Sequence, residues 1–274
     1  MRKLVDSTAL VTGASSGIGR AIAIELARRG SGVVLVARRK ERLETLADEV
    51  RTRFGVHAEV EVVDLSRPEA PEELVRRLEA ADIQVDILVN NAGFGIHRAF
   101  LETPWERQRA MLSVNVVALT ELTRLLVPPM VARGTGKVMN VASIGAYLPV
   151  PGYAVYASAK AYVRNFTEAL DAELSGTGVR AIAISPGSVR TEFLEHAELE
   201  LNRVGDLLTI SAERCASIAV TRMLGGRRTL VPGYLNALGM WLLRFVPRRQ
   251  QTFFGWLAMG ATASPAPSHA ESRQ

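Results

Sequence analysis

The chain has 274 residues, of which 48% are hydrophobic and 22% charged, and these are the proportions of an ordinary globular protein. A chain of this length can bury a core without disulfides or metals, in one large domain or two small ones. The single cysteine excludes an internal disulfide, and the four scattered histidines give no metal-ligating pattern, so we expect no metal site. The net charge of +5 comes from dispersed arginine pairs, which favour an anionic cofactor or a membrane surface over nucleic acid as a partner.

The two ends of the chain differ in character. The N-terminus enters a strand-like run without the apolar segment of a signal peptide, so we expect a cytoplasmic protein. The most apolar segment, 234–260, is interrupted by Arg244 and by Pro247 with the arginine pair after it, so it predicts two amphipathic helices rather than a membrane span. These helices would cap a pocket, form an oligomer interface or lie peripherally on a membrane. Residues 261–274 lack periodicity and are expected to form a disordered tail.

Short β-branched runs alternate with longer amphipathic stretches along most of the chain. Strands are expected at 9–12, 33–37, 58–63, 86–90, 137–141, 179–185 and 229–231, and helices at 18–29, 39–53, 71–81, 105–132, 153–175 and 212–224. Continuous apolar runs such as Val33–Ala37 are typical of parallel strands that helices cover on both faces. The pattern predicts an α/β fold: a Rossmann-type, doubly wound parallel sheet of about seven strands in one domain, 1–232, with a helical appendage at 233–260.

A glycine-rich turn joins the first strand to the first helix. Gly13 would permit the tight turn, Gly17 would let the backbone approach a pyrophosphate, and Gly19 would let helix and strand pack closely. The free N–H groups and the positive dipole end of the helix would then face the anion. Ser15, Ser16 and Ile18 complete the expected phosphate-binding turn.

The spacing Thr-Gly-x-x-x-Gly-x-Gly resembles the fingerprint of the short-chain dehydrogenase/reductase family. Further family motifs follow in order, so that the resemblance covers residues 8–191. They are Asn90-Asn91-Ala92-Gly93, Asn115, Ser143, Tyr156-x-x-x-Lys160 and Pro186-Gly187-x-Val189-x-Thr191. The resemblance implies hydride transfer between a nicotinamide nucleotide and a carbonyl carbon.

The end of the second strand predicts which nucleotide binds. NAD-binding units place an acidic residue there for the ribose hydroxyls, whereas this chain has Ala37 followed by Arg38 and Arg39. A guanidinium pairs with a 2′-phosphate that a carboxylate would repel, so we predict NADP(H), with Arg38 as the main ligand and Arg39 assisting. The alternative is that both arginines form a solvated helix start.

Tyr156 and Lys160 lie four residues apart in a helical pattern, on one face of the helix. A phenol titrates near pH 10, and a neighbouring ammonium together with a bound nicotinamide cation would favour its ionised form. Tyr156 is therefore the candidate general acid and base. Ser143 would stabilise charge that develops on the substrate oxygen.

The resemblance assigns further roles by position. Asn115 would support a water-linked proton relay to Lys160, which would also hold the nicotinamide ribose. Asp64 would meet the adenine amino group, or would cap a turn, with Leu65 beside it. The segments Asn91–Gly93 and 186–191 would complete the nicotinamide site, with Val189 and Thr191 contacting the carboxamide.

The substrate is the least determined part. Phe94, Ile96, Tyr147, Leu148 and Tyr153 are candidate pocket walls, and the leucine-rich segment 191–210 would line or cap the pocket while its acidic residues face water. His97 and His196 are expected to be packing or solvated residues rather than proton shuttles. We predict an NADPH-dependent reductase of a hydrophobic ketone or aldehyde, acyl-chain or steroid-like, in a homo-oligomer; the alternative is a non-catalytic NADP-sensing regulator on the same fold.

Overall fold

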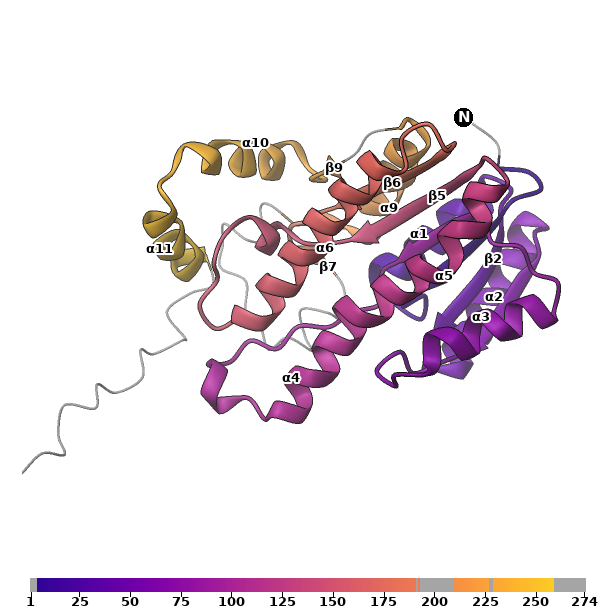
Figure 1. Ribbon diagram of the computed structural model, residues 1–274, viewed down its shortest axis with the longest axis horizontal. Coiled ribbons are helices and arrows are strands. Elements are labelled where there is room, and N and C mark those ends of the chain that lie inside the picture. Colours follow the sequence, from indigo (N-terminus) through magenta and orange to yellow (C-terminus); the bar gives the residue numbers. More distant parts are fainter. Residues whose placement is uncertain (1–3, 191, 193–208, 227–228, 259–274) are drawn as a thin grey trace, which may run out of the picture.

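A seven-stranded parallel sheet forms the centre of the computed structural model, which describes residues 4–190, 192, 209–226 and 229–258. The strand order is β3-β2-β1-β4-β5-β6-β9 (Figure 1). The strands are β1 (Thr8–Thr12), β2 (Gly32–Ala37), β3 (Ala58–Val62), β4 (Ile87–Asn90), β5 (Gly136–Val141), β6 (Val179–Ile184) and β9 (Thr229–Leu230). This arrangement confirms the predicted doubly wound sheet. A separate two-stranded sheet, β7 (Val189–Arg190) with β8 (Ile210–Ser211), was not predicted.

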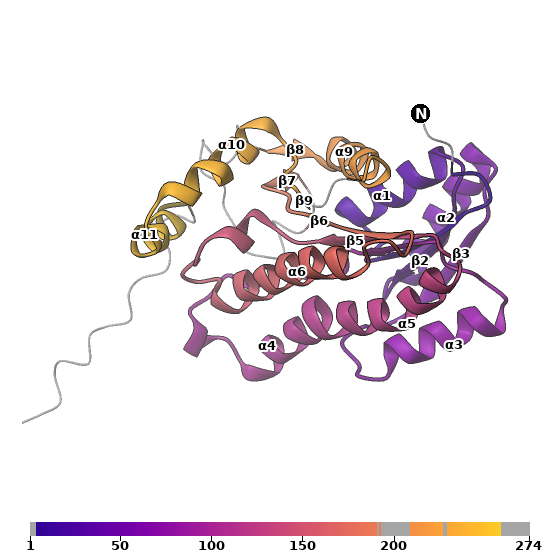
Figure 2. The ribbon, with the colours of Figure 1, turned by 45° about the horizontal axis from the view of Figure 1, so that its top comes forward.

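Helices cover the sheet on both faces. They are α1 (Gly17–Arg28), α2 (Lys40–Phe54), α3 (Ala70–Ala80), α4 (Trp105–Leu112), α5 (Leu119–Ala132), α6 (Ala154–Glu173) and α9 (Ala212–Leu224), with short 3-10 turns η1 (Phe100–Glu102) and η3 (Ile144–Tyr147). Figure 2 shows α1, α2 and α9 on one side of the sheet and α3, α5 and α6 on the other. Each predicted helix is present, with ends that differ by up to two residues.

The core divides into two apolar layers because alternate residues of each strand point to opposite faces. In β1, Ala9 and Val11 pack with α1, α2 and α9, whereas Leu10 packs with α3 and α5. All three side chains are fully buried, as expected for a parallel sheet sandwiched between helices. The sulfur of Cys215 lies in the first layer and is a free thiol.

The strand order reverses direction at β1, which pairs with β2 on one side and β4 on the other. In open α/β sheets, ligands bind beyond the carboxyl ends of the strands at such a switch point. The fold therefore predicts a ligand-binding site among the loops that follow β1, β2 and β4.

The long helical run Trp105–Ala132 contains one local change of winding. Its middle, η2 (Ser113–Ala118), is a π-helix, although the sequence pattern predicted regular helix throughout. By length and composition this run is the one described helix that could cross a membrane. Its side chains Leu122, Leu126 and Met130 are instead buried against the sheet, as in a core helix.

The C-terminal appendage consists of α10 (Tyr234–Leu242), the 3-10 turn η4 (Leu243–Phe245) and α11 (Arg248–Ala258). Two helices on either side of Pro247 were predicted, and the structure confirms them. Figures 1 and 2 both show them standing beyond the body of the fold, beside the start of α6. The predicted disordered tail lies outside the described residues.

Candidate active site

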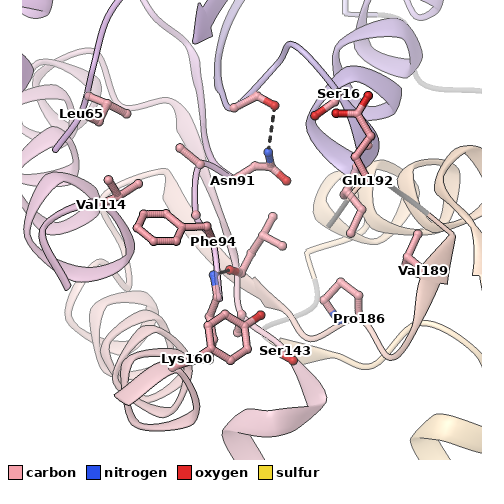
Figure 3. Close-up of a pocket in the computed structure, with 18 of the residues that line it drawn as sticks. Ser16, Leu65, Asn91, Phe94, Val114, Ser143, Lys160, Pro186, Val189 and Glu192 are labelled. Atoms are coloured by element: carbon pink, nitrogen blue, oxygen red, sulfur yellow. Dashed lines mark hydrogen bonds between the residues drawn. The ribbon is translucent and has the colours of Figure 1, made fainter. Parts of the chain in front are cut away.

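One cavity of about 510 Å³ opens at the carboxyl ends of the strands. Nearly all the predicted site residues line it, from the glycine turn at one end to Tyr156 and Lys160 at the other. Figure 3 shows this span, with Ser16 and Glu192 at one end and Ser143 and Lys160 at the other. Gly19 and Asn115 lie behind the lining, and Thr191 falls outside the described residues.

The glycine turn has the geometry that its sequence predicts. Gly13 and Gly17 adopt φ of +69° and +56°, a left-handed region in which a side chain is strained. Gly19 serves close packing instead, because a Cβ built on it would lie 2.4 Å from the carbonyl oxygen of Gly13. Each of the three positions therefore has a separate physical reason to be glycine.

Replacing Gly19 by alanine should lower the free energy of unfolding by about 3 kcal/mol or more, since backbone must move to admit the methyl group. The matched control is Gly239→Ala, also within a helix, where a Cβ meets nothing within 4 Å. That control should be neutral or should stabilise by about 0.5–1 kcal/mol. Urea denaturation of both variants makes the measurement, and equal midpoints would contradict the packing role of Gly19.

Thr12 joins the glycine turn to the segment after β4. Its hydroxyl oxygen accepts hydrogen bonds from the backbone N–H groups of Asn91 and Ala92, both at 3.0 Å. In return, the Asn91 amide donates to the Thr12 carbonyl oxygen at 2.9 Å. These bonds fix the glycine turn and the segment after β4 relative to each other.

Arg39 connects the glycine turn to the segment that follows β7. Its guanidinium donates to the hydroxyls of Ser15 at 3.0 Å and Ser16 at 2.7 Å, and to the Glu192 carboxylate at 2.9 Å. Arg42 donates to the same carboxylate at 2.5 Å, and these bonds lower the pKa of Glu192. The acidic residues of this segment were expected to face water; the Glu192 side chain is 36% exposed, and it also pairs with two arginines and lines the cavity.

Arg38 and Asp64 lie at the same end of the cavity. Arg38 is exposed. Asp64 Oδ1 accepts from the backbone N–H of Ser66 at 3.0 Å and from its hydroxyl at 2.8 Å. Burial raises the pKa of Asp64, but the bonds from Ser66 and the charge of Arg38 outweigh it, so that the pKa is lowered. Asp64 thus caps its turn and still presents a carboxylate to the cavity.

The catalytic candidates come from β5 and α6. Ser143 follows β5 and accepts a hydrogen bond from the Gly145 N–H at 3.1 Å, while its hydroxyl is also hydrogen-bonded to Tyr156. Lys160 Nζ lies 5.8 Å from the centre of the Tyr156 ring and donates to the Val141 carbonyl at 2.9 Å (Figure 3). The structure therefore brings the three side chains together on one wall.

Burial has the largest effect on the protonation of this wall, and the expectation that Lys160 and a bound nicotinamide cation together favour the ionised phenol stays a prediction. Burial raises the pKa of Tyr156 to about 12, and the bond from Ser143 only partly offsets this. Burial also lowers the pKa of Lys160 to about 8, so that the group is still mostly an ammonium at pH 7 and loses its charge above pH 8. Desolvation is the largest cause of the pKa shift in both groups. A phenol with this pKa is protonated at neutral pH.

Replacing Lys160 by methionine should raise the free energy of unfolding at pH 7 by roughly 1–3 kcal/mol, because a buried ammonium is removed. Unfolded lysine titrates at 10.5 and folded Lys160 at about 8, so the unfolded chain binds more protons between these values and the wild type gains stability there as pH rises. The difference in free energy of unfolding between the variant and the wild type should be largest below pH 8 and should fall to zero towards pH 10.5. Denaturation series at several pH values measure it.

The exposed Lys40 supplies the control, since Lys40→Met removes an ammonium that has lost little hydration. It should leave the stability within about 0.5 kcal/mol of the wild type at every pH. If Lys160→Met showed no pH-dependent increase in the free energy of unfolding, the desolvation of Lys160 would be contradicted.

Asn115 lies in the π-helical segment and is fully buried. Its amide donates to the Phe94 carbonyl at 2.9 Å, whereas Oδ1 has no hydrogen-bond partner among the described residues. A Cβ on Gly93 would lie 2.1 Å from that oxygen and 3.3 Å from Lys160 Nζ. An acceptor held beside the lysine, behind a glycine, fits the water-linked relay that the resemblance implies.

Apolar side chains make the remaining wall. Figure 3 shows Phe94 and Val114 together on one side of the cavity, and Val150 and Tyr153 also line it. Of the other expected wall residues, Ile96 borders a minor cavity of about 10 Å³, and Tyr147 and Leu148 line neither.

Tyr153 adds a polar group that the sequence did not reveal. The residue is buried and its hydroxyl has no partner among the described residues. Its ring lies 5.3 Å from the Tyr156 ring and is stacked on His97 at 4.9 Å. This stacking fits the expectation that His97 is a packing residue, while His196 lies outside the described residues.

A buried chain of amides holds α6 in register with the sheet. Asn90 donates to Asn140 at 2.9 Å, and Asn140 donates to the Thr167 hydroxyl at 2.9 Å. Because Thr167 follows Lys160 by about two helical turns, this chain helps to fix where α6 places its catalytic candidates. No local pattern in the sequence signals these pairings.

Comparison with known proteins identifies the family. A family model described as short chain dehydrogenase matches residues 7–202. The chain belongs to the short-chain dehydrogenase family. Members of this family are oxidoreductases that use a nicotinamide cofactor.

Relatives of this short-chain dehydrogenase include an uncharacterized oxidoreductase of Myxococcus xanthus, 38% identical over 70% of this chain and 76% of the relative. This chain is also 32% identical to mouse 17-beta-hydroxysteroid dehydrogenase type 3, over 77% of this chain and 72% of the mouse protein. Among solved structures, this chain resembles a short-chain dehydrogenase from Sphingobium yanoikuyae in complex with NADPH. The TM-score is 0.77 and the identity 31%, with 88% of this chain and 97% of that one covered.

Proposed function

We propose that this short-chain dehydrogenase is an NADPH-dependent reductase of hydrophobic ketones or aldehydes. The observation that carries the proposal is the juxtaposition, in one cavity, of a neutral tyrosine beside a serine and a lysine with two arginines at the far end. When bound, NADPH would supply the hydride. The glycine turn fits a dinucleotide pyrophosphate, because side chains are excluded where its backbone must come close.

The residues of the catalytic wall would act on the carbonyl oxygen. Ser143 would donate a hydrogen bond to it, and Tyr156 would deliver the proton as negative charge develops. A phenol with a pKa of about 12 is protonated at neutral pH, which suits a proton donor and therefore the reductive direction. Lys160 would return a proton to Tyr156 through a water-linked relay, in which the buried Asn115 Oδ1 would accept a hydrogen bond from the water.

The opposite end of the cavity would select the phosphorylated nucleotide. Arg38 and Arg39 are the cations in its lining, and Ser15 and Ser16 add hydroxyls beside them. The described residues at the end of β2 include no carboxylate, which favours a 2′-phosphate over free ribose hydroxyls. The NADPH complex of the Sphingobium relative supports this choice.

The walls favour an apolar substrate, since Phe94, Val114 and Val150 lie near the catalytic groups. Two further relatives support an apolar substrate. A very-long-chain 3-oxoacyl-CoA reductase of Anas platyrhynchos is 34% identical to this chain, over 67% of this chain and 60% of that protein. The structure of a 7beta-hydroxysteroid dehydrogenase matches this chain with a TM-score of 0.83 and 27% identity. In the latter match, 91% of this chain and 96% of the other are covered.

A panel of carbonyl compounds, followed by the loss of NADPH absorbance, tests the proposal. Acyl-chain and steroid ketones should be turned over, with small polar sugars as the matched comparison at equal concentration. Binding of NADPH without turnover of any carbonyl would favour the alternative of a non-catalytic NADP sensor. Preferential turnover of the sugars would contradict the hydrophobic substrate class.

A further inference from the structure

The helix α10 turns its apolar side outward. The side chains Tyr234, Leu235, Leu238, Trp241, Leu242 and, in η4, Phe245 are between 41% and 84% exposed. Their spacing of i, i+1, i+4, i+7, i+8 and i+11 places them on one helical face. We call this set the apolar stripe. An apolar stripe of this width normally faces a protein core, so its exposure needs a partner.

The opposite side of α10 is fixed against the body of the protein by a polar residue. Asn236 is 6% exposed, and a Cβ on Gly187 would lie 2.6 Å from its amide nitrogen. In α11, a Cβ on Gly255 would lie 2.2 Å from the Pro149 carbonyl oxygen. These close approaches leave no room for α10 to rotate its stripe inward without breaking both contacts.

The charged side chains of the segment that contains the stripe, 214–270, are all basic. Between Glu213 and Glu271 the sequence contains no aspartate or glutamate. The exposed Arg244, Arg248 and Arg249 lie at the junction of the two helices, next to the exposed Phe253. Exposed aromatic and leucine side chains bordered by arginines are the composition of helices that lie in the headgroup region of an anionic bilayer.

A second copy of the chain fits this face less well. In a two-fold symmetric contact the same patch occurs on both subunits, so Arg244, Arg248 and Arg249 would meet their own equivalents. With no carboxylate in the surrounding segment, such a contact would bring like charges together without compensation. A lipid surface with anionic headgroups supplies the missing negative charge.

We propose that the apolar stripe and Arg244, Arg248 and Arg249 form a peripheral docking surface for an anionic bilayer. This goes beyond the proposed reductase activity and does not depend on it. Gly187 and Val150 line the catalytic cavity, and they adjoin the residues that α10 and α11 contact. The docked surface would therefore lie beside the cavity.

Co-sedimentation of the full-length protein with vesicles tests the proposal, in the absence of substrate and NADPH. The wild type should partition at least tenfold more strongly to vesicles of phosphatidylcholine with phosphatidylglycerol than to phosphatidylcholine alone. Trp241→Ser combined with Phe245→Ser should lower that partition at least tenfold, and Arg248→Glu combined with Arg249→Glu should do so on the anionic vesicles. All four side chains described here are exposed, so melting temperatures should stay close to wild type.

The control is Phe100→Ser combined with Leu101→Ser, which removes two apolar side chains, 56% and 91% exposed, from η1 instead. This pair should leave vesicle binding unchanged. The proposal is overturned if the wild type does not sediment with anionic vesicles, or if the control pair loses as much binding. It is equally overturned if the Trp241 and Phe245 changes dissociate a dimer in size-exclusion chromatography without changing vesicle binding, because the stripe would then contact a second copy.

Discussion

Replacing Tyr156 by phenylalanine should lower kcat for carbonyl reduction by about 10²- to 10⁴-fold and leave the Kd for NADPH within about twofold. The reason is that the phenol is the proton donor in the mechanism we propose, while the ring that packs against Tyr153 is retained. Burial keeps this phenol protonated, with its pKa raised to about 12. Steady-state kinetics and a fluorescence titration with NADPH measure the two quantities separately.

The matched control for this change is Tyr162→Phe. Tyr162 lies on the same helix, is 39% exposed, and is hydrogen-bonded to the Thr120 hydroxyl at 2.9 Å, away from the cavity. Its loss should alter kcat by less than about twofold. If Tyr156→Phe kept most of the activity, or if Tyr162→Phe lost as much, Tyr156 would not be the proton donor.

Replacing Arg38 by aspartate should lower the preference for NADPH over NADH by about 10²-fold or more, chiefly through a higher KM for NADPH. In the proposed mode of binding, a charge-assisted hydrogen bond to the 2′-phosphate would be lost and a like charge would take its place. The carboxylate would also stand where NAD-binding units hold the ribose hydroxyls. The measurement is the ratio of kcat/KM for the two nucleotides with one carbonyl substrate.

Two further variants complete this test. Arg53→Asp changes an exposed arginine at the far end of α2 and should leave the ratio unchanged. Arg39→Ala measures how much Arg39 contributes to the preference for NADPH. We expect a smaller effect than for Arg38→Asp, because the Arg39 guanidinium already donates to Ser15, Ser16 and Glu192. An unaltered nucleotide preference in Arg38→Asp would contradict its assignment as the main phosphate ligand.

The parts of the structure that could be predicted depend on local sequence. Continuous apolar runs such as Val33–Val36 specify strands buried on both faces, and a strand followed at once by Gly13, Gly17 and Gly19 specifies the turn. Tyr156 and Lys160 share a helical face because they are four residues apart. These relations act over a few residues, so spacing alone reveals them.

The parts that could not be predicted depend on contacts between distant residues. Glu192 meets Arg39 across 153 positions of sequence, and nothing near either residue signals the pair. The pKa values of Tyr156 and Lys160 follow from how deeply the whole fold buries them, which composition does not give. Likewise, the apolar residues of α10 could have faced inward; the contact of Asn236 with Gly187 decides that they face outward.

A crystal structure of the protein with NADPH and a bound ketone tests the central claim most directly. The account predicts that Tyr156 Oη and Ser143 Oγ both lie about 3 Å from the ketone oxygen, at the end of the cavity away from Arg38 and Arg39. A ketone oxygen that instead contacts another donor, with Tyr156 out of hydrogen-bonding reach, would contradict it.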